Sequence, residues 1–436
     1  MQPRQLHFCA HDICRRSTVK PGAVRMCMVR YHLRVTISEF LPTSKRVRSG
    51  AKRAAFTTSE VARFRYRNVR NPHRAVTRLL LLTDFKEYTS DQQYAPIMRN
   101  GGEIYSLGDI NSVVCDLRIA ETIGVPSLDE FDGVGFKLSF RTPADKALGI
   151  AMRIKERISP STSLIYFDGD DDLNIQWPEI LDVSDVYVKK QVFRNLSAYE
   201  SRYIGKSNLS DYVVGKFDKK FQDVLETHSG PVSTTNLAKI RCGWNIGLDD
   251  RIFRLAQAGL ASPTSPRAID ICGRATADPD QWISPLRESM MSSLTQLTDE
   301  FRVAVPTERV PLEQYYEEMK SSSICVSPFG YGEICWRDFE AILSGCLLVK
   351  PDMGHVRTQP DIYVPGETYA PVAWDYSDLR EVCSRYLSDD DARHQMVRRA
   401  QQVVLEALEP QWMADRLHHV LQDLDGSDIR NVRLPS

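Results

Sequence analysis

A short segment late in the chain combines glycines, two glutamates and an arginine in a pattern that could bind a phosphate. Gly330 and Gly332 let the backbone turn sharply and approach a ligand closely. From about Glu333 the apolar residues follow a helical period, which would place Glu333, Arg337 and Glu340 on one side, at i, i+4 and i+7. A helix start behind a glycine loop offers free N–H groups and a positive dipole end to an anion.

The same three charges have a plainer interpretation, a solvated helix face with a Glu–Arg–Glu ion-pair ladder. The flanking sequence favours the binding site. Residues 324–326 and 347–349 are apolar runs of the length of buried strands, and Gly345 is placed to end the helix as a left-handed cap. Ligands collect at such loops in open α/β sheets. The segment therefore predicts a βαβ unit with an anion-binding face.

A cluster of acidic residues follows an earlier strand-like run, residues 163–167. Asp168, Asp170 and Asp171 have the oxygen ligands that Mg²⁺ or Mn²⁺ prefers. The alternative is an acidic turn in which Gly169 supplies the unusual backbone angle. About 160 residues separate the cluster from the glycine loop, which favours the structural interpretation. We therefore expect no metal and no cofactor, with a divalent ion at Asp168 and Asp170 as the alternative.

Charge is distributed unevenly along the 436 residues, although the formal net charge is only −1. Residues 1–78 contain 18 Lys/Arg and 3 Asp/Glu, which leaves 38 basic and 54 acidic residues in the remainder. No period persists over residues 1–75, so we expect a basic, disordered leader. Arg63, Arg65 and Arg67 alternate with aromatic residues there, and the alternative is an arm for nucleic acid or an anionic membrane. We expect no nucleic-acid partner.

The ten cysteines are scattered, and several lie inside apolar runs, where a free thiol acts as a small core residue. No pair has the CxxC spacing of zinc ligands. This usage indicates a reducing compartment, so we expect a cytoplasmic protein, with peripheral contact at the inner face of the membrane as a further expectation. No apolar run approaches the ~20 residues of a membrane span.

Strand-like and helix-like runs alternate through most of the chain. A strand is indicated at residues 78–84, a helix within 108–121 and further strands at 136–140 and 163–167. The pattern predicts an α/β protein of two Rossmann-like domains, with parallel sheets facing across a cleft and a C-terminal helix crossing back. The expected divisions are a leader (1–75), an acceptor domain (76–245), a nucleotide-sugar-binding domain (246–424) and a tail (425–436).

Residues 323–352 resemble the nucleotide-sugar-binding segment of exostosin-like and related two-Rossmann (GT-B) glycosyltransferases. The residues that carry the resemblance are Ser-Pro-Phe-Gly-Tyr-Gly at 327–332, Arg337, Glu340 with Ala341, and Gly-Cys-Leu-Leu-Val at 345–349. Two features depart from the family pattern. Cys335 stands where the exostosin pattern usually has serine, and the two glutamates are seven residues apart instead of eight.

The resemblance implies a glycosyltransferase of the hexosyltransferase type, with a nucleotide-sugar donor and a saccharide or lipid-linked acceptor, acting in the synthesis of surface polysaccharide or glycoconjugates. It implies that Gly330, Tyr331 and Gly332 hold the donor diphosphate, that Glu340 binds the ribose, and that Arg337 neutralises the leaving phosphate. Glu333 would contact the donor sugar.

Three further residues belong to this hypothesis. Arg274, just after a strand, is a second phosphate candidate, and a surface ion pair is its alternative. Asp84, at the end of the first strand, would be the general base if the reaction inverts configuration. His355 could face the cleft, but an exposed loop histidine is the favoured interpretation.

Competing functions remain open at this stage. An epimerase or phosphorylase shares the fold, although no pyridoxal-phosphate lysine motif is present. A non-catalytic nucleotide- or sugar-binding protein of the same fold is the main alternative.

Overall fold

The computed structural model describes residues 50–85, 92–118, 127–205, 207–217, 231–305 and 309–422. The chain separates into two units, residues 1–47 and 48–436. The first unit lies outside the described residues, as does most of the expected basic leader. The description below concerns the second unit.

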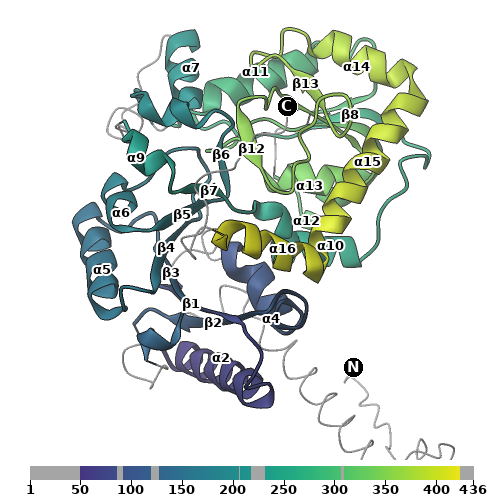
Figure 1. Ribbon diagram of the computed structural model, residues 1–436. Helices are drawn as coiled ribbons and strands as arrows, with labels where there is room; N and C mark the ends of the chain where they lie inside the picture. Colours follow the sequence, from purple (N-terminus) through teal and green to yellow (C-terminus); the bar gives the residue numbers. More distant parts are fainter. Residues whose placement is uncertain are drawn as a thin grey trace, which may run out of the picture. The chain divides into compact units, whose positions relative to one another are not determined.

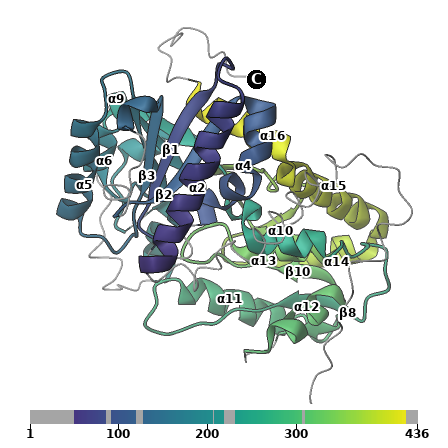
Figure 2. The ribbon, with the colours of Figure 1, turned by 90° about the horizontal axis from the view of Figure 1, so that it is seen from below.

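A six-stranded parallel sheet forms the first half, in the order β2-β1-β3-β4-β5-β7. Leu79 to Leu82 of β1 are at most 4% exposed, as expected of a strand covered on both faces. Helices α5 and α6 lie on one side of the sheet and α2 and α4 on the other (Figures 1 and 2). The strands are β1 (Thr77–Thr83), β2 (Ile110–Asp116), β3 (Gly133–Lys137), β4 (Ser163–Asp168), β5 (Val186–Lys189) and β7 (Ile240–Cys242).

The helices of this half are α2 (Gly50–Arg70), α4 (Ala95–Gly108), α5 (Ala144–Arg157), α6 (Pro178–Val183), α7 (Asn208–Phe217) and α9 (Thr234–Leu237), with single 3₁₀ turns η1 (Gln92–Tyr94), η2 (Leu128–Glu130) and η3 (Leu196–Glu200). The predicted helix within 108–121 is wrong, because its centre is strand β2. Its apolar run Val113-Val114-Cys115 is completely buried between neighbouring elements, as in a strand with both faces covered.

Helix α2 corrects the prediction of a disordered leader over residues 1–75, for residues 50–70 alone. It packs along β2 (Figure 2). Thr57, Val61 and Phe64 are buried at helical spacing, and Phe64 lies 5.3 Å from Phe131, ring centroid to ring centroid. Arg53 Nε contacts Asp116 at 2.9 Å. The dense arginines obscure this buried helix face in the sequence pattern, because some of them point toward the sheet instead of into water.

The second half contains a five-stranded parallel sheet in the order β13-β11-β10-β8-β9. Its strands are β8 (Ile269–Gly273), β9 (Val303–Ala304), β10 (Ser322–Val326), β11 (Leu347–Pro351) and β13 (Ala370–Val372). Its helices are α10 (Asp250–Gln257), α11 (Ser284–Thr295), α12 (Leu312–Lys320), α13 (Trp336–Leu343), α14 (Leu379–Ser388), α15 (Asp390–Leu408) and α16 (Pro410–Leu421), preceded by the 3₁₀ turn η4 (Ile246–Leu248). The predicted class, α/β with two Rossmann-like parallel-sheet halves, is confirmed.

A pair of strands and the last helix are among the connections that join the halves. Strand β6 (Gln191–Phe193) from the first half pairs antiparallel with β12 (Val356–Thr358) from the second. Helix α16 leaves the second half and packs against α4 (Figures 1 and 2). The Arg416 Nε of α16 donates a hydrogen bond of 2.9 Å to the Gly243 carbonyl, just after β7. The expectation of a C-terminal helix that crosses back is therefore confirmed.

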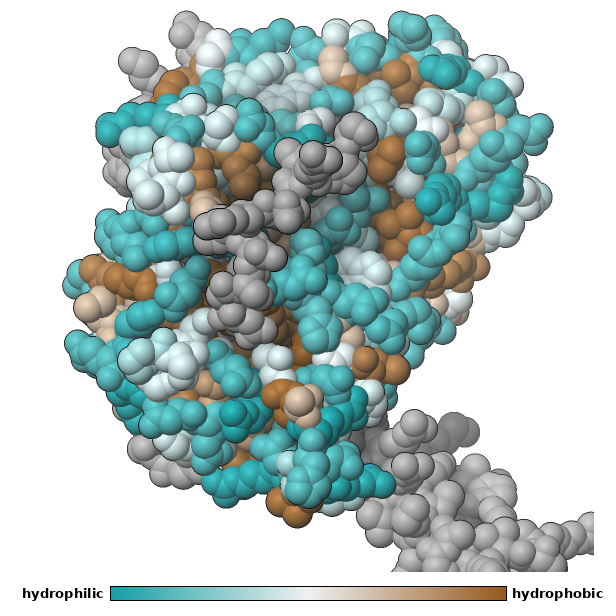
Figure 3. All heavy atoms as spheres, viewed as in Figure 1, coloured by the Kyte–Doolittle hydropathy of each residue, from teal (hydrophilic) through white to brown (hydrophobic). Residues whose placement is uncertain are grey.

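The face of the molecule in Figure 3 is mostly hydrophilic, and its apolar residues form small separate groups. Within the described ranges, no helix has the length and apolar content needed to cross a membrane.

Candidate functional site

The βαβ unit predicted around the glycine loop is present, with β10 and β11 paired in parallel and α13 between them. Gly345, at φ 78°, ends the helix as expected. The helix begins at Trp336, because Cys335 and Asp338 form a capping box at its N-terminus. Arg337 and Glu340 share one side of the helix, but Glu333 precedes the helix. The prediction that all three project from one helix face is wrong for Glu333.

A pocket with a volume of about 410 Å³ opens over the start of α13. Among the described residues, its charged lining consists of four arginines and one glutamate, so the positive charges there exceed the negative ones by three. Such a pocket favours a ligand with more than one negative charge. The lining residues are Arg251, Ala275, Thr276, Arg287, Arg309, Tyr315, Pro328, Phe329, Gly330, Cys335, Trp336, Arg337 and Glu340.

Glu340 is 1% exposed, and three groups contact its carboxylate. The hydroxyls of Tyr315 and Tyr316 each donate to it at 2.9 Å, and Arg251 pairs with it at 2.5 Å. Burial raises the pKa of Tyr315, and burial together with the Glu340 carboxylate raises that of Tyr316, so both phenols are neutral donors at physiological pH. A ribose hydroxyl that binds Glu340 must share or replace these contacts.

The arginines of the pocket come from separate elements. Arg337 lies on α13, and its Nε is buried without a hydrogen-bond partner among the described residues. Arg287 on α11 donates 2.8 Å to the Thr276 carbonyl, and burial lowers its pKa. Arg309 lies before α12 and is exposed. An unsatisfied guanidinium N–H beside a cationic pocket suits a phosphate oxygen.

A buried polar network fixes the start of α13. Asp338 accepts hydrogen bonds from the Cys335 N–H at 3.0 Å, the Ser327 hydroxyl at 2.5 Å and the Tyr363 hydroxyl at 2.7 Å. Lys350 Nζ pairs with the same carboxylate at 3.1 Å, and both side chains are completely buried. The glycine loop and Arg337 are therefore held on a rigid support.

Gly332 lies against the acidic cluster of the first half. The separation of about 160 residues in the sequence was therefore a wrong reason to place the cluster away from the glycine loop. A Cβ at Gly332 would collide with the backbone of Asp171 and Asp172. The glycine is required by this contact within the protein, and its φ is not positive. Residues far apart in sequence thus meet where the two halves adjoin.

We predict that Gly332→Ala lowers the free energy of unfolding by about 1–3 kcal/mol, because the methyl group overpacks this junction. Gly330→Ala is the matched control, since its Cβ would lie 3.2 Å from the Cys335 Sγ, a contact that a small shift relieves. Urea unfolding of both variants tests the difference. Equal midpoints for the two variants would contradict the close contact at Gly332.

Asp168 belongs to a buried ion pair. Its carboxylate accepts from Lys189 Nζ and from the Tyr187 hydroxyl, each at 2.8 Å, and the Asp168 and Lys189 side chains are both 1% exposed. Asp171 pairs with Lys190 at 2.8 Å. Among the residues that the structure describes, no group of three or more His, Cys, Asp or Glu is placed to hold a metal. A divalent ion at Asp168 and Asp170 stays the alternative expectation for this cluster.

We expect Asp168→Ala to destabilise the fold by about 3–5 kcal/mol, since it leaves the Lys189 charge buried without a counter-charge. Asp170→Ala should cost much less, because its backbone N–H, which donates to Asp168 at 3.0 Å, is kept. Urea midpoints measured with and without EDTA separate the two interpretations. A dependence on EDTA that both variants abolish would favour a metal.

Glu333 is 0% exposed, and neither carboxylate oxygen has a hydrogen-bond partner among the described residues. His355 Nε2 lies 3.5 Å from Glu333 Oε1. The His355 side chain is 19% exposed, so the favoured interpretation of an exposed loop histidine is wrong. Its ring packs against Trp374 at 5.1 Å between centroids.

Arg274, Asp84 and Tyr331 do not line the pocket. The Arg274 Nε donates 2.8 Å to Glu318, in the ion pair that was the alternative for this residue. Asp84 is buried at the carboxyl end of β1 and accepts a hydrogen bond of 3.2 Å from the Ser139 N–H. Tyr331 is 47% exposed, with the Arg287 guanidinium over its ring at 5.9 Å. Their predicted roles stay predictions.

The sequence hypothesis missed three lining arginines, Arg251, Arg287 and Arg309. The three arginines share no sequence motif, because each follows a different strand. The arrangement of the strands in the fold brings them together. Their position in the sequence is the one feature that could have indicated them. Each arginine lies just before a helix of the second half or in its first turn, on the side of the fold that carries the glycine loop.

Residues 282–419 match the model of a family described as "Glycosyl transferase-like". This region contains Arg287, Arg309, the glycine loop and α13, and it is about a third of the chain. No curated protein gives a significant match.

Several solved structures are similar to this chain in their backbone structure. They include a UDP co-structure of Staphylococcus aureus MnaA, at 9% identity, covering 80% of this chain and 97% of that one, with a TM-score of 0.39. A glycosyltransferase from Rickettsia africae covers 81% and 100%, at 10% identity and a TM-score of 0.41. A trehalose-6-phosphate protein of Escherichia coli bound with UDP-2-fluoro glucose covers 80% and 99%, at 8% identity and a TM-score of 0.42. The family match over residues 282–419 supports the coarse class, a glycosyltransferase.

Proposed function

We propose that the protein is a glycosyltransferase that moves a sugar from a nucleotide-sugar donor to a saccharide or lipid-linked acceptor. The observation that carries the proposal is the cationic pocket over α13, with four arginines around one concave surface and the buried carboxylate of Glu340. Guanidinium groups bind a diphosphate through charge-assisted hydrogen bonds, and a carboxylate accepts hydrogen bonds from ribose hydroxyls.

The same geometry supports a role in leaving-group departure. As the bond between sugar and phosphate breaks, negative charge accumulates on the diphosphate. Arg337, Arg287 and Arg309 surround the place where this charge would develop, so they stabilise the departing group more than the intact donor. In this proposal the three arginines supply the positive charge for this step. Glu333 would contact the sugar and Asp84 would be a base on an inverting route.

A panel of UDP-, GDP-, CMP- and TDP-sugars in a thermal-shift screen tests the proposal, followed by mass spectrometry for transfer to added saccharides. A selective rise in melting temperature with one nucleotide and release of its nucleoside diphosphate are the expected results. Absence of any shift across the panel would contradict donor binding. A shift without turnover on any acceptor would favour the alternative, a non-catalytic nucleotide- or sugar-binding protein.

The finer expectations are proposals of the same kind. They are the exostosin-like subgroup, a hexose as the transferred sugar, surface-polysaccharide or glycoconjugate synthesis, and a cytoplasmic setting with peripheral membrane contact. Cys335 forms the helix cap at the position of the usual serine, which is compatible with the subgroup. The seven cysteines within the described ranges are free, as expected in a reducing compartment.

A further inference from the structure

Glu333 and the Nε2 atom of His355 face each other as buried polar groups that make no hydrogen bond to the described residues. Both Glu333 oxygens and His355 Nε2 lack a hydrogen-bond partner among the described residues. The 3.5 Å between Nε2 and Oε1 is long for a direct hydrogen bond. A buried carboxylate without hydrogen bonds is costly, so a further polar group is expected beside it in the working protein.

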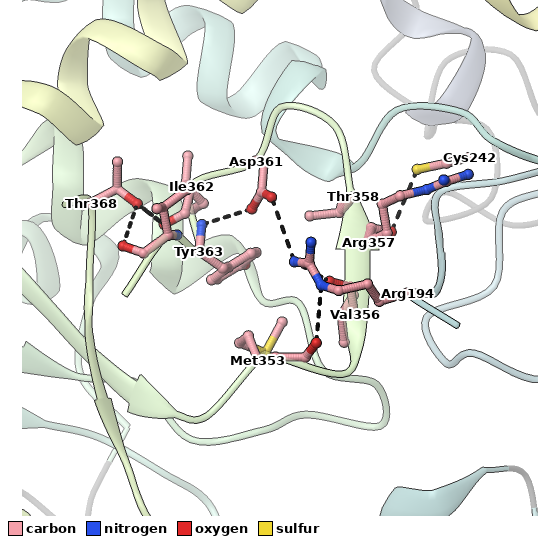
Figure 4. A network of polar contacts seen from close by, with 12 residues as sticks. Arg194, Cys242, Met353, Val356, Arg357, Thr358, Asp361, Ile362, Tyr363 and Thr368 are labelled. Carbon is pink, nitrogen blue, oxygen red and sulfur yellow. Dashed lines mark hydrogen bonds and ion pairs between the residues drawn. The ribbon is translucent and has the colours of Figure 1, made fainter. Parts of the chain in front are cut away.

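The backbone that carries His355 is held by one residue of the first half, Arg194. The backbone N–H of Arg194 donates to the His355 carbonyl at 2.8 Å. The Arg194 side chain donates to the Gly354 and Val356 carbonyls, each at 3.0 Å. Three successive carbonyls thus accept from Arg194. Figure 4 shows the guanidinium between the 353–356 backbone and Asp361, whose carboxylate lies 3.8 Å from it.

The imidazole ring is fixed as well. It packs against Trp374, whose Nε1 donates 2.9 Å to the Asp352 carbonyl. Trp374 also contacts Phe329, at 5.3 Å between ring centroids, and Phe329 lines the arginine pocket. Contacts through the Trp374 and Phe329 rings therefore connect the Glu333–His355 pair to the proposed diphosphate site. A side chain held at so many points is arranged for a defined contact.

We propose that His355 is a positioning and specificity residue: it holds the Glu333 carboxylate and, together with it, binds a hydroxyl of the sugar ring attached to the nucleotide. This inference rests on the function proposed above and adds a second wall to the sugar site. A hydroxyl beside the two groups donates to one Glu333 oxygen and accepts from His355 Nε2–H, which gives each of these two atoms a partner. The ligand class is a pyranose with free hydroxyls.

Two substitutions separate this role from a structural one. His355→Phe keeps a ring against Trp374 and removes the Nε2 donor. His355→Gln keeps an N–H at about the same distance from the backbone. Calorimetry compares the nucleoside diphosphate that the wild-type chain binds most tightly, among UDP, GDP and TDP, with the hexose ester of the same nucleotide.

We expect His355→Phe to weaken binding of the hexose ester about tenfold, since the hydrogen bond from the imidazole Nε2–H to the sugar hydroxyl is lost. The sugar-free nucleoside diphosphate should bind all three proteins within about twofold, and His355→Gln should restore most of the ester affinity. Equal weakening of both ligands, or unchanged affinity for the ester, would overturn the inference. If the wild-type chain binds neither ligand, the proposed function fails first, which is a distinct outcome.

Discussion

Glu340→Ala is expected to weaken nucleotide-sugar binding by about 100-fold or more. The carboxylate is 1% exposed and organises Tyr315, Tyr316 and Arg251 around the pocket. Its removal takes away the acceptor for the ribose hydroxyls and leaves the Arg251 guanidinium without its counter-charge. Hydrogen bonds to a charged group are worth about 1.5–3 kcal/mol each, so the loss of two amounts to at least two orders of magnitude. Isothermal calorimetry with the selected donor measures the effect.

Glu340→Gln is the matched control, because it keeps the shape and one acceptor oxygen while it removes the charge. Its affinity should lie between those of the wild type and the alanine variant. Circular dichroism melting of both variants shows whether the fold survives. Unchanged donor affinity in a folded Glu340→Ala variant would remove Glu340 from the site.

Arg337→Ala is expected to lower kcat by about 100- to 1,000-fold, the size of effect seen when one preorganised donor to a developing charge is lost. Arg337 lines the pocket beside Gly330, and its Nε is buried without a partner among the described residues. The interaction is strongest when the diphosphate carries its full leaving-group charge, so kcat should fall more than donor affinity. Steady-state kinetics with the selected donor and acceptor measure both.

Arg302→Ala is the control for a general loss of positive charge from this half. Arg302 pairs with Asp270, is 62% exposed and does not line the pocket, so kcat should stay within about twofold of the wild type. An equal loss of kcat in both variants would indicate a long-range charge effect. A normal kcat for Arg337→Ala would contradict the assignment of Arg337 to the leaving group.

Much of the fold follows from local apolar patterns. The strand from Thr77 has an apolar run that specifies it, and the βαβ unit around Gly345 has two such runs and a glycine cap. Helix α2 was missed because its buried stripe, Thr57, Val61 and Phe64, is interrupted by arginines that bond inward. Arg67, for example, donates 2.7 Å to the Ser112 carbonyl. A hydropathy pattern assigns every charged side chain to the surface, even where the fold provides a partner for it inside.

The candidate site was only partly predictable, for a related reason. Arg337 and Glu340 are neighbours on one helix, so their spacing reveals them. Arg251 and Arg287 reach the pocket from other helices, and the approach of His355 to Glu333 depends on a clamp by Arg194, more than 150 positions away. Contacts of this kind come from the order of strands in the sheets and from the meeting of the two halves, which no local pattern encodes.

A crystal structure of the chain with the nucleoside diphosphate chosen by the donor screen tests the central claim most directly. The account predicts the diphosphate in the pocket over α13, with its oxygens within hydrogen-bond distance of Arg337 and of Arg287 or Arg309, and the ribose hydroxyls on Glu340. A diphosphate bound elsewhere, with this pocket empty, would contradict it.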